Sequence, residues 1–167
     1  MKIKVKIIVG LGNPDKEYEK TYHNAGFLAV DFFAENPPIS NFQFSIFKLL
    51  KSDVYMNQSG NFVKTILNKY KINPEKLLIA QDDSDIEIGK YKLSFGRGSA
   101  GHKGIESIIK SLKTKNFWRL RIGIRKTTKG ERPKAEDFVL KKISAFDYKK
   151  LESVFKEAKA IINNDDN

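Results

Sequence analysis

Short apolar runs of strand length alternate along this chain with longer amphipathic segments, and this alternation restricts the possible folds more than any other feature. Ile7-Ile8-Val9 and Leu77-Leu78-Ile79-Ala80 have the length and apolar character of buried strands, whereas residues 57–70 carry apolar side chains at helical spacing. The strand-like segments are 3–9, 77–80, 90–95 and 119–124, with 42–50 a strand or part of a hairpin; the helix-like segments are 24–35, 57–70, 103–113 and 146–162. Such an alternation predicts an α/β protein.

Length and composition set the scale of this fold. The chain has 167 residues, of which 40% are hydrophobic and 11% aromatic, enough for one domain to bury a core without disulfides. We expect residues 1–163 to form that single domain and the polar residues 164–167 to form a tail that frays. The predicted architecture is a mixed, partly parallel, twisted sheet with helices on both faces.

The charge balance favours a polyanionic partner. Lysine and arginine total 31 against 20 acidic residues, a net charge of +11, which attracts nucleic acid first and anionic membranes second. A lysine-rich surface with no such partner is the alternative. The chain has no cysteine, no apolar run of signal-peptide type and no stretch of about 20 apolar residues, so we expect a cytoplasmic protein without a membrane span.

A cluster of amides and an imidazole follows the first predicted strand. Gly10-Leu11-Gly12-Asn13-Pro14 ends the strand with a sharp turn, and His23 and Asn24 open the next helix-like segment. These side chains belong at the carboxyl end of a strand, where open α/β sheets form ligand sites. A purely structural, hydrogen-bonding His23 is the alternative.

Three more clusters follow the other predicted strands or begin helices. They are Tyr55 to Gly60, Gln81 to Asp85, and Gly101-His102-Lys103-Gly104. An imidazole beside a carboxylate is the simplest general-base unit, so we expect His23 and Asp82 to pair if the fold brings them together. The amides of Asn13 and Asn57 are suited to hold a carbonyl oxygen or an oxyanion, since amides donate without titrating.

Each of these clusters also has a simpler interpretation. Asn57 could be a helix N-cap, and the aspartates 82, 83 and 85 could be loop carboxylates or a hard-cation site. Other common sites are excluded by their motifs: the glycines at 96–104 match neither a Walker A loop nor a dinucleotide fingerprint, and no serine lies in a nucleophile elbow.

Taken together, the clusters resemble the bacterial-type peptidyl-tRNA hydrolase family. The family's motifs occur here in the same order as GLGNP at 10–14, TYHNAG at 21–26, VYMNQSG at 54–60, QDDSD at 81–85, GSAGHKG at 98–104, FWRLRIGI at 117–124 and FVL at 138–140. The resemblance spans residues 3–162 and implies hydrolysis of the ester that links a peptide to the 3′ ribose of tRNA.

The resemblance also implies roles for individual residues. His23 would be the general base and Asp82 its orienting partner. Peptidyl-tRNA would be bound by Asn13, Tyr18, Met56, Asn57 and Lys103, and the tRNA phosphates by Lys92, Arg121 and Arg125. No metal or organic cofactor is implied, and we expect a monomer.

The chain departs from the family pattern at four places. Asp15 replaces a glycine, Lys103 an asparagine and Gln81 a common histidine, and region 36–54 is short. Lys103 would lower the pKa of His23 or contact a phosphate or the ribose. The competing hypothesis is a non-catalytic RNA-binding protein on the same scaffold, which would be free to lose the His23–Asp82 pair.

Overall fold

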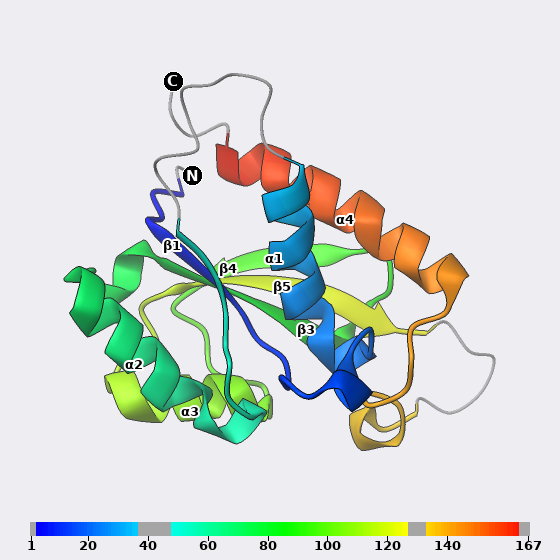
Figure 1. The fold of residues 1–167 in the computed structure, drawn as a ribbon, viewed down its shortest axis with the longest axis horizontal. Coiled ribbons are helices and arrows are strands. Elements are labelled where there is room, and N and C mark those ends of the chain that lie inside the picture. The colour runs from blue at the N-terminus through cyan, green and yellow to red at the C-terminus, as the bar shows by residue number, and fades with distance from the viewer. Residues whose placement is uncertain (1–2, 37–47, 127–132, 164–167) are drawn as a thin grey trace.

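A twisted sheet forms the centre of the computed structural model, which describes residues 3–36, 48–126 and 133–163 (Figure 1). Its strands are β1 (Ile7–Gly10), β2 (Lys48–Lys51), β3 (Leu77–Glu87), β4 (Tyr91–Phe95) and β5 (Trp118–Arg125). The α-helices are α1 (Ala25–Glu35), α2 (Ser59–Tyr70), α3 (Lys103–Leu112) and α4 (Ala145–Asn163). Short 3₁₀ helices are η1 (Lys16–Tyr18), η2 (Tyr22–Asn24), η3 (Met56–Gln58), η4 (Pro74–Lys76) and η5 (Ala135–Asp137).

The sheet is mixed and mostly parallel. Its strand order is β2-β1-β3-β5-β4, with parallel pairing throughout except at the edge, where β4 runs antiparallel to β5. The parallel strands end at one edge of the sheet, so the segments that follow them meet there. The predicted fold class is thereby confirmed.

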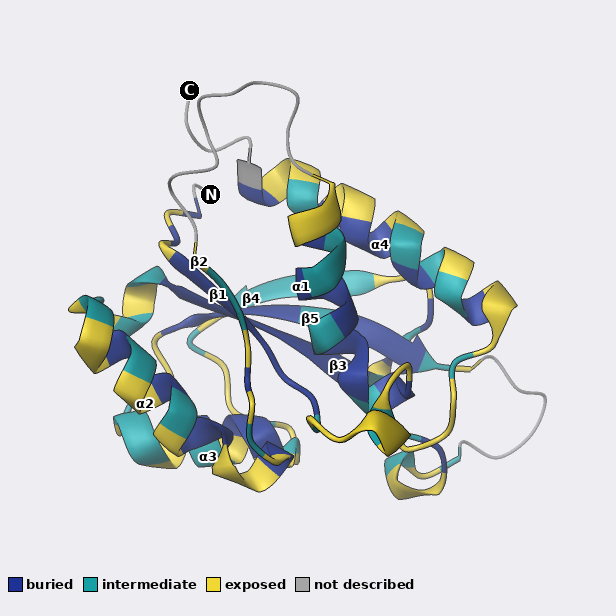
Figure 2. Ribbon diagram, in the orientation of Figure 1, coloured by how far each residue is buried: buried dark blue, intermediate teal, exposed yellow. Residues whose placement is uncertain are grey.

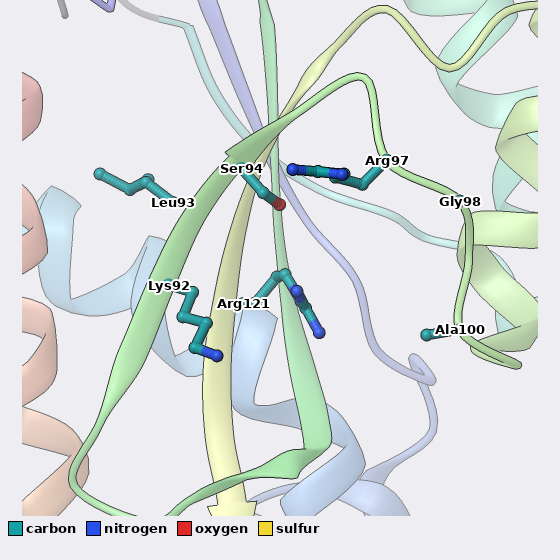
Figure 3. A pocket seen from close by; sticks show the side chains of 7 residues that line it. All are labelled: Lys92, Leu93, Ser94, Arg97, Gly98, Ala100 and Arg121. Atoms are coloured by element: carbon teal, nitrogen blue, oxygen red, sulfur yellow. The ribbon is translucent and has the colours of Figure 1, made fainter.

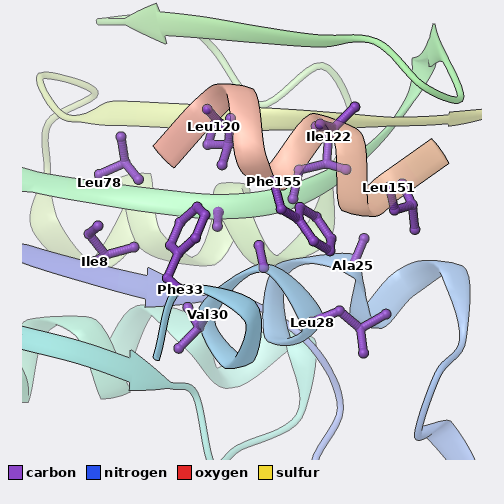
Figure 4. Close-up of a cluster of buried hydrophobic side chains, with 14 of the residues drawn as sticks. Ile8, Ala25, Leu28, Val30, Phe33, Leu78, Leu120, Ile122, Leu151 and Phe155 are labelled. Carbon is purple, nitrogen blue, oxygen red and sulfur yellow. The ribbon is translucent and has the colours of Figure 1, made fainter. Parts of the chain in front are cut away.

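Each face of the sheet is covered by two helices. The helices α1 and α4 pack on one face against Ile8, Leu78 and Leu120, as Figure 4 shows, and α2 and α3 pack on the other against Ile7 and Val9. Neighbouring residues of a strand point to opposite faces, so β1 must be apolar at every position to serve both layers. Figure 2 shows the result: the central strands are buried, and each helix buries the side that faces the sheet.

Strand β3 is much longer than predicted. The expected strand, 77–80, continues to Glu87, so Gln81, Asp82 and Asp83 belong to the strand and not to a loop. Their backbones extend the ladder with β5, Asp83 pairing with Gly123, before the register shifts. The sequence pattern missed this because the three side chains are polar, although all three are buried.

Two other expectations need correction. The first strand, predicted for 3–9, begins at Ile7, because regular pairing with β2 and β3 starts there. Of segment 42–50, residues 42–47 lie outside the described part; the rest belongs to β2, a parallel strand beside β1, whereas a hairpin requires antiparallel pairing. The predicted tail, 164–167, also lies outside the described residues.

The four predicted helices are present to within two residues of their expected ends. Two of them, α2 and α3, end at lysines in the left-handed conformation, Lys71 and Lys113. Asp15, which stands where the family has glycine, has a φ of −69°, so this turn does not require the left-handed region. No helix in the described residues has the length and apolar character needed to cross a membrane.

Candidate active site

A cavity of about 810 Å³ lies beyond the carboxyl end of β1, beside residues 81–85 of β3 and at the amino end of α3. We call it the central cavity. Its polar lining includes Asn13, His23, Asn57, Asp82, His102 and Lys103. The topology therefore brings together all four clusters found in the sequence, which are separated by up to about half the chain.

His23 and Asp82 form the pair that the sequence predicts. The Nδ1 atom of His23 lies 2.9 and 3.0 Å from the two carboxylate oxygens of Asp82. His23 belongs to η2, which is tied by a backbone hydrogen bond from its N–H to the carbonyl of Val139. Because Nδ1–H donates to the carboxylate, the second ring nitrogen, Nε2, carries the lone pair, and it has no hydrogen-bond partner within the described chain.

The environment shifts the pKa values of both members of this pair. Burial lowers the pKa of His23, but the charge and the hydrogen bond of Asp82 outweigh that effect and the opposing charge of Lys103, so the net shift is upward. Burial raises the pKa of Asp82, but the two neighbouring histidines more than compensate and hold it well below its usual range. Asp82 is therefore a carboxylate at neutral pH, beside an imidazole whose pKa is raised above the usual 6.5.

His102 is the second histidine on this carboxylate. Its Nε2 atom lies 3.0 Å from Oδ1 of Asp82, and its side chain is 9% exposed. The sequence groups His102 with Lys103 at a helix start but assigns it no role. The logic that paired His23 with an aspartate applies equally to His102, since these are the chain's two histidines.

Asn13 is held by hydrogen bonds on two sides. Its side-chain oxygen accepts from the backbone N–H of Met56 (3.0 Å), and its backbone exchanges hydrogen bonds with the side chain of Asn24 (2.8 and 2.9 Å). These contacts fix which way the amide points, so its NH₂ group is left as a donor at the cavity. The predicted Asn13–Asn24 cluster is thus a preformed unit that joins β1 to η2 and η3.

Met56 and Asn57 lie side by side in η3, at the cavity wall. Met56 is buried and packs on α3: a Cβ atom added to Gly104 would lie 2.5 Å from the Met56 sulfur. Asn57 is exposed and lines the cavity. The N-cap interpretation of Asn57 is wrong, because α2 is preceded by Gln58 and no side chain caps it.

Tyr18 lies apart from the central cavity. It ends η1 and is not among the cavity-lining residues, so the structure does not bring it together with the other predicted substrate-binding residues. Tyr55 lines the cavity instead, and its hydroxyl donates to the carboxylate of Asp15. The adjacent Met56-Asn57 motif could have indicated Tyr55, which is 46% exposed.

Three side chains of this site have the composition of a metal-binding set. Donor atoms of His23, Asp82 and His102 lie within 4.8 Å of one another. However, the Nδ1 atom of His102 accepts hydrogen bonds from the N–H groups of Gly104 and Ile105, so its proton lies on Nε2, toward Asp82. Both ring nitrogens that face the carboxylate then carry protons, and a metal ion would have to displace both.

A second, positively charged hollow of about 780 Å³ lies on the other side of loop 98–101. We define this cationic hollow by Lys92, Ser94, Arg97 and Arg121, whose side chains Figure 3 shows, and Ala100 lines both hollows. The Nε atom of Arg121 lies 2.7 Å from Asp83, which fixes the guanidinium. Of the predicted phosphate-binding residues, Lys92 and Arg121 line the hollow and Arg125 does not; Arg97 was not predicted.

A histidine–aspartate pair with one open imidazole nitrogen, at the carboxyl edge of an α/β sheet, is the arrangement with which hydrolases activate water. Residues 7–164 match the family model described as peptidyl-tRNA hydrolase. The chain belongs to this family, as its motifs predicted.

The sequences and structures of known relatives match nearly the whole of this chain. The peptidyl-tRNA hydrolase of Aquifex aeolicus (strain VF5) is 39% identical over 170 residues, covering 92% of this chain and 86% of the relative. That of Metamycoplasma arthritidis (strain 158L3-1) is 42% identical over 159 residues, covering 90% and 85%. The crystal structure of peptidyl-tRNA hydrolase from Acinetobacter baumannii matches with a TM-score of 0.81 at 33% identity, covering 96% of this chain and 87% of that one.

Proposed function

We propose that this protein hydrolyses the ester bond of peptidyl-tRNA, with a water molecule activated by His23. The observation that carries the proposal is the His23–Asp82 pair, whose open Nε2 atom belongs to an imidazole that lines the central cavity. Family membership supports this activity, and the retained pair disfavours the alternative of a non-catalytic RNA-binding protein.

The reaction is a general-base hydrolysis. Nε2 of His23 takes a proton from water while the water oxygen attacks the ester carbonyl, and Asp82 stabilises the imidazolium that forms. The amides of Asn13 and Asn57 hold the oxyanion of the tetrahedral intermediate. When the bond to the 3′ oxygen breaks, the imidazolium returns the proton to that oxygen, which releases tRNA and a peptide with a free carboxyl group.

The cationic hollow supplies a surface for tRNA phosphates. Lys92, Arg97 and Arg121 present charges around one depression, adjacent to the central cavity across loop 98–101. Phosphate contacts position a nucleic acid without reading its sequence, as a hydrolase that accepts many tRNAs requires. Arg125, at the end of β5, would extend this surface.

All residues of the proposed reaction come from one chain, and none of its steps requires a metal ion. We therefore infer a monomeric enzyme that acts without a metal or organic cofactor. Its substrate arises during translation, and this supports our inference of a cytoplasmic location.

The test is the release of tRNA from an N-blocked aminoacyl-tRNA by wild-type protein and His23→Ala. We expect release by the wild type, abolished by the substitution, with uncharged tRNA bound equally by both. If the wild type binds tRNA but releases none, the hydrolase proposal fails and the RNA-binding alternative replaces it. Undiminished release by His23→Ala would reject His23 as the base.

A further inference from the structure

His102 caps a helix with its ring. It precedes α3 in an extended conformation, and its Nδ1 atom accepts from the N–H groups of Gly104 (3.2 Å) and Ile105 (3.4 Å). Serine, threonine, aspartate and asparagine are the usual residues at this position. An N-cap must accept hydrogen bonds, so the lone pair of Nδ1 is committed to the helix and the ring proton lies on Nε2.

The other nitrogen of the His102 ring contacts the Asp82 carboxylate, which also pairs with His23. Nε2 of His102 lies 3.0 Å from Oδ1 of Asp82, which the Nδ1 atom of His23 also approaches, and the two imidazole centroids are 5.4 Å apart. We infer that His102 is a positioning residue: a neutral imidazole, fixed as the Nε2–H tautomer by the start of α3, that holds Asp82 in the orientation that His23 needs. This inference rests on the proposed role of His23.

Buried polar contacts hold the loop that carries His102. The guanidinium of Arg119, which is 1% exposed, donates through Nε to Gln81 (2.8 Å) and through Nη1 to the carbonyl of Gly98. Gln81 in turn donates to the backbone carbonyl of Asp82 (3.0 Å). Beyond Gly98, two residues with positive φ, Ala100 and Gly101, turn the chain back toward the strand.

These contacts form a closed circuit. It runs from Asp82 through Gln81 and Arg119 to loop 98–101, and returns through the His102 ring to the Asp82 carboxylate. The hydrogen bonds of this circuit explain why Arg119 can be buried beneath the loop. Burial and the charge of Arg121 lower the pKa of Arg119 to about 10, against a smaller opposing effect of Asp83. Arg119 is therefore still a cation at neutral pH.

His102 also moderates the basicity of the pair. A carboxylate that accepts from two donors binds each less strongly than one that accepts from a single donor, so we expect the His102 hydrogen bond to weaken the contact through which Asp82 raises the pKa of His23. The other charges facing this cavity are Lys103 on α3, Asp83 and Asp85 on β3, and Glu136 on η5. A neutral donor orients Asp82 without adding a second charge beside the base.

Two substitutions of His102 test its two contacts separately: the helix cap made by Nδ1 and the hydrogen bond from Nε2 to Asp82. In His102→Asn the side-chain oxygen replaces Nδ1 as the helix cap, but the amide is too short to reach Asp82. In His102→Gln the amide nitrogen occupies the place of Nε2 and donates to Asp82, but the cap is lost. We expect His102→Asn to keep the wild-type Tm, to lower kcat roughly tenfold, and to move the acid limb of the pH–rate profile upward by about half a unit to one unit. His102→Gln should leave the acid limb where it is and lower Tm by about 2–4 °C.

A second measurement does not depend on catalysis. Because the chain has two histidines, a long-range ¹H–¹⁵N spectrum of the wild type at pH 8 contains only two imidazoles, which His23→Ala and His102→Asn assign. We expect opposite tautomers, with the proton on Nδ1 in His23 and on Nε2 in His102.

The outcomes distinguish this inference from the proposed function. A proton on Nδ1 of His102, or an acid limb that His102→Asn leaves in place, overturns the positioning role even if the enzyme hydrolyses its substrate. Opposite tautomers together with full activity in His23→Ala would instead reject the proposed base while leaving the ring geometry intact.

Discussion

Two neighbouring aspartates of β3 show how different the two hollows are. Asp82, in the central cavity, pairs with two imidazoles, and Asp83 pairs with the guanidinium of Arg121 at the cationic hollow. The first carboxylate faces two imidazole rings, which donate to it through N–H groups, whereas the second faces a guanidinium that is always charged.

The difference lies in what each arrangement can do. Asp82 is buried, its two imidazole partners are half-buried and held by backbone contacts, and one of them has a shifted pKa, which suits chemistry on one bond. Lys92 and Arg97, by contrast, are exposed cations on a surface, which suits a large, mobile polyanion. We therefore propose that loop 98–101 separates reaction from phosphate binding, so variants on its two sides should affect different kinetic constants.

The largest expected effect is that of removing the base. His23→Ala should lower kcat by about 10²–10⁴-fold, because it removes the Nε2 lone pair that accepts the proton of the attacking water. Single-turnover release of tRNA from N-blocked aminoacyl-tRNA measures this, and the Kd for uncharged tRNA should be unchanged. A parallel rise in Kd would contradict the separation of reaction from binding.

Asp82→Asn should lower kcat by about 10²-fold or more. The new amide can present an N–H toward Nδ1 of His23, which then favours the opposite tautomer, with its lone pair turned away from the cavity. Without the carboxylate the pKa of His23 also falls, since Asp82 is what raises it, so the acid limb should move to lower pH. A pH–rate profile tests both effects, and an acid limb that stays in place would contradict this account of the pair.

For the wild type, the raised pKa of His23 predicts activity that is lost as the pH falls through a value above 6.5.

On the other side of loop 98–101, in the cationic hollow, Lys92→Gln should raise KM several-fold at constant kcat, because Lys92 contacts tRNA phosphate in our proposal. Removing one phosphate contact should also reduce the slope of log KM against log salt concentration by about one. Lys64 is exposed on α2 and lies outside both hollows, so Lys64→Gln makes the same change of charge and serves as the control. Equal effects of the two variants would show that net charge, not the hollow, attracts tRNA.

The smallest effect belongs to Lys103→Asn. The ammonium lowers the pKa of His23, so its removal should raise that pKa and move the acid limb upward by less than about one unit. Lys103 also places a cation at the amino end of α3, where the helix dipole disfavours it, so helix stability does not explain this residue. Lys110→Asn, at the other end of α3, is the control and should leave the profile unchanged. If Lys103→Asn leaves the pH–rate profile unchanged, the charge of Lys103 does not lower the pKa of His23.

Much of the fold could be predicted from the sequence, because periodicity reports burial. Residues 57–70 repeat apolar side chains at helical spacing and form α2 within a few residues. Strand β3 was predicted too short, because Gln81, Asp82 and Asp83 are polar and only their partners across the fold make their burial possible. Polar residues in a sheet core carry no local signal of where their partners lie.

The same division applies to the site. The sequence by itself determined which chemical groups follow the strands, and its ordered motifs determined the family. The proximity of His23 to Asp82, 59 residues apart, was a conditional expectation that the parallel strand order made real. The tertiary structure alone decided that His102 shares this carboxylate, that Tyr55 rather than Tyr18 lines the cavity, and that Arg97 joins Lys92. These are contacts between segments distant in the sequence, and their geometry exists only once the sheet has brought the segments together.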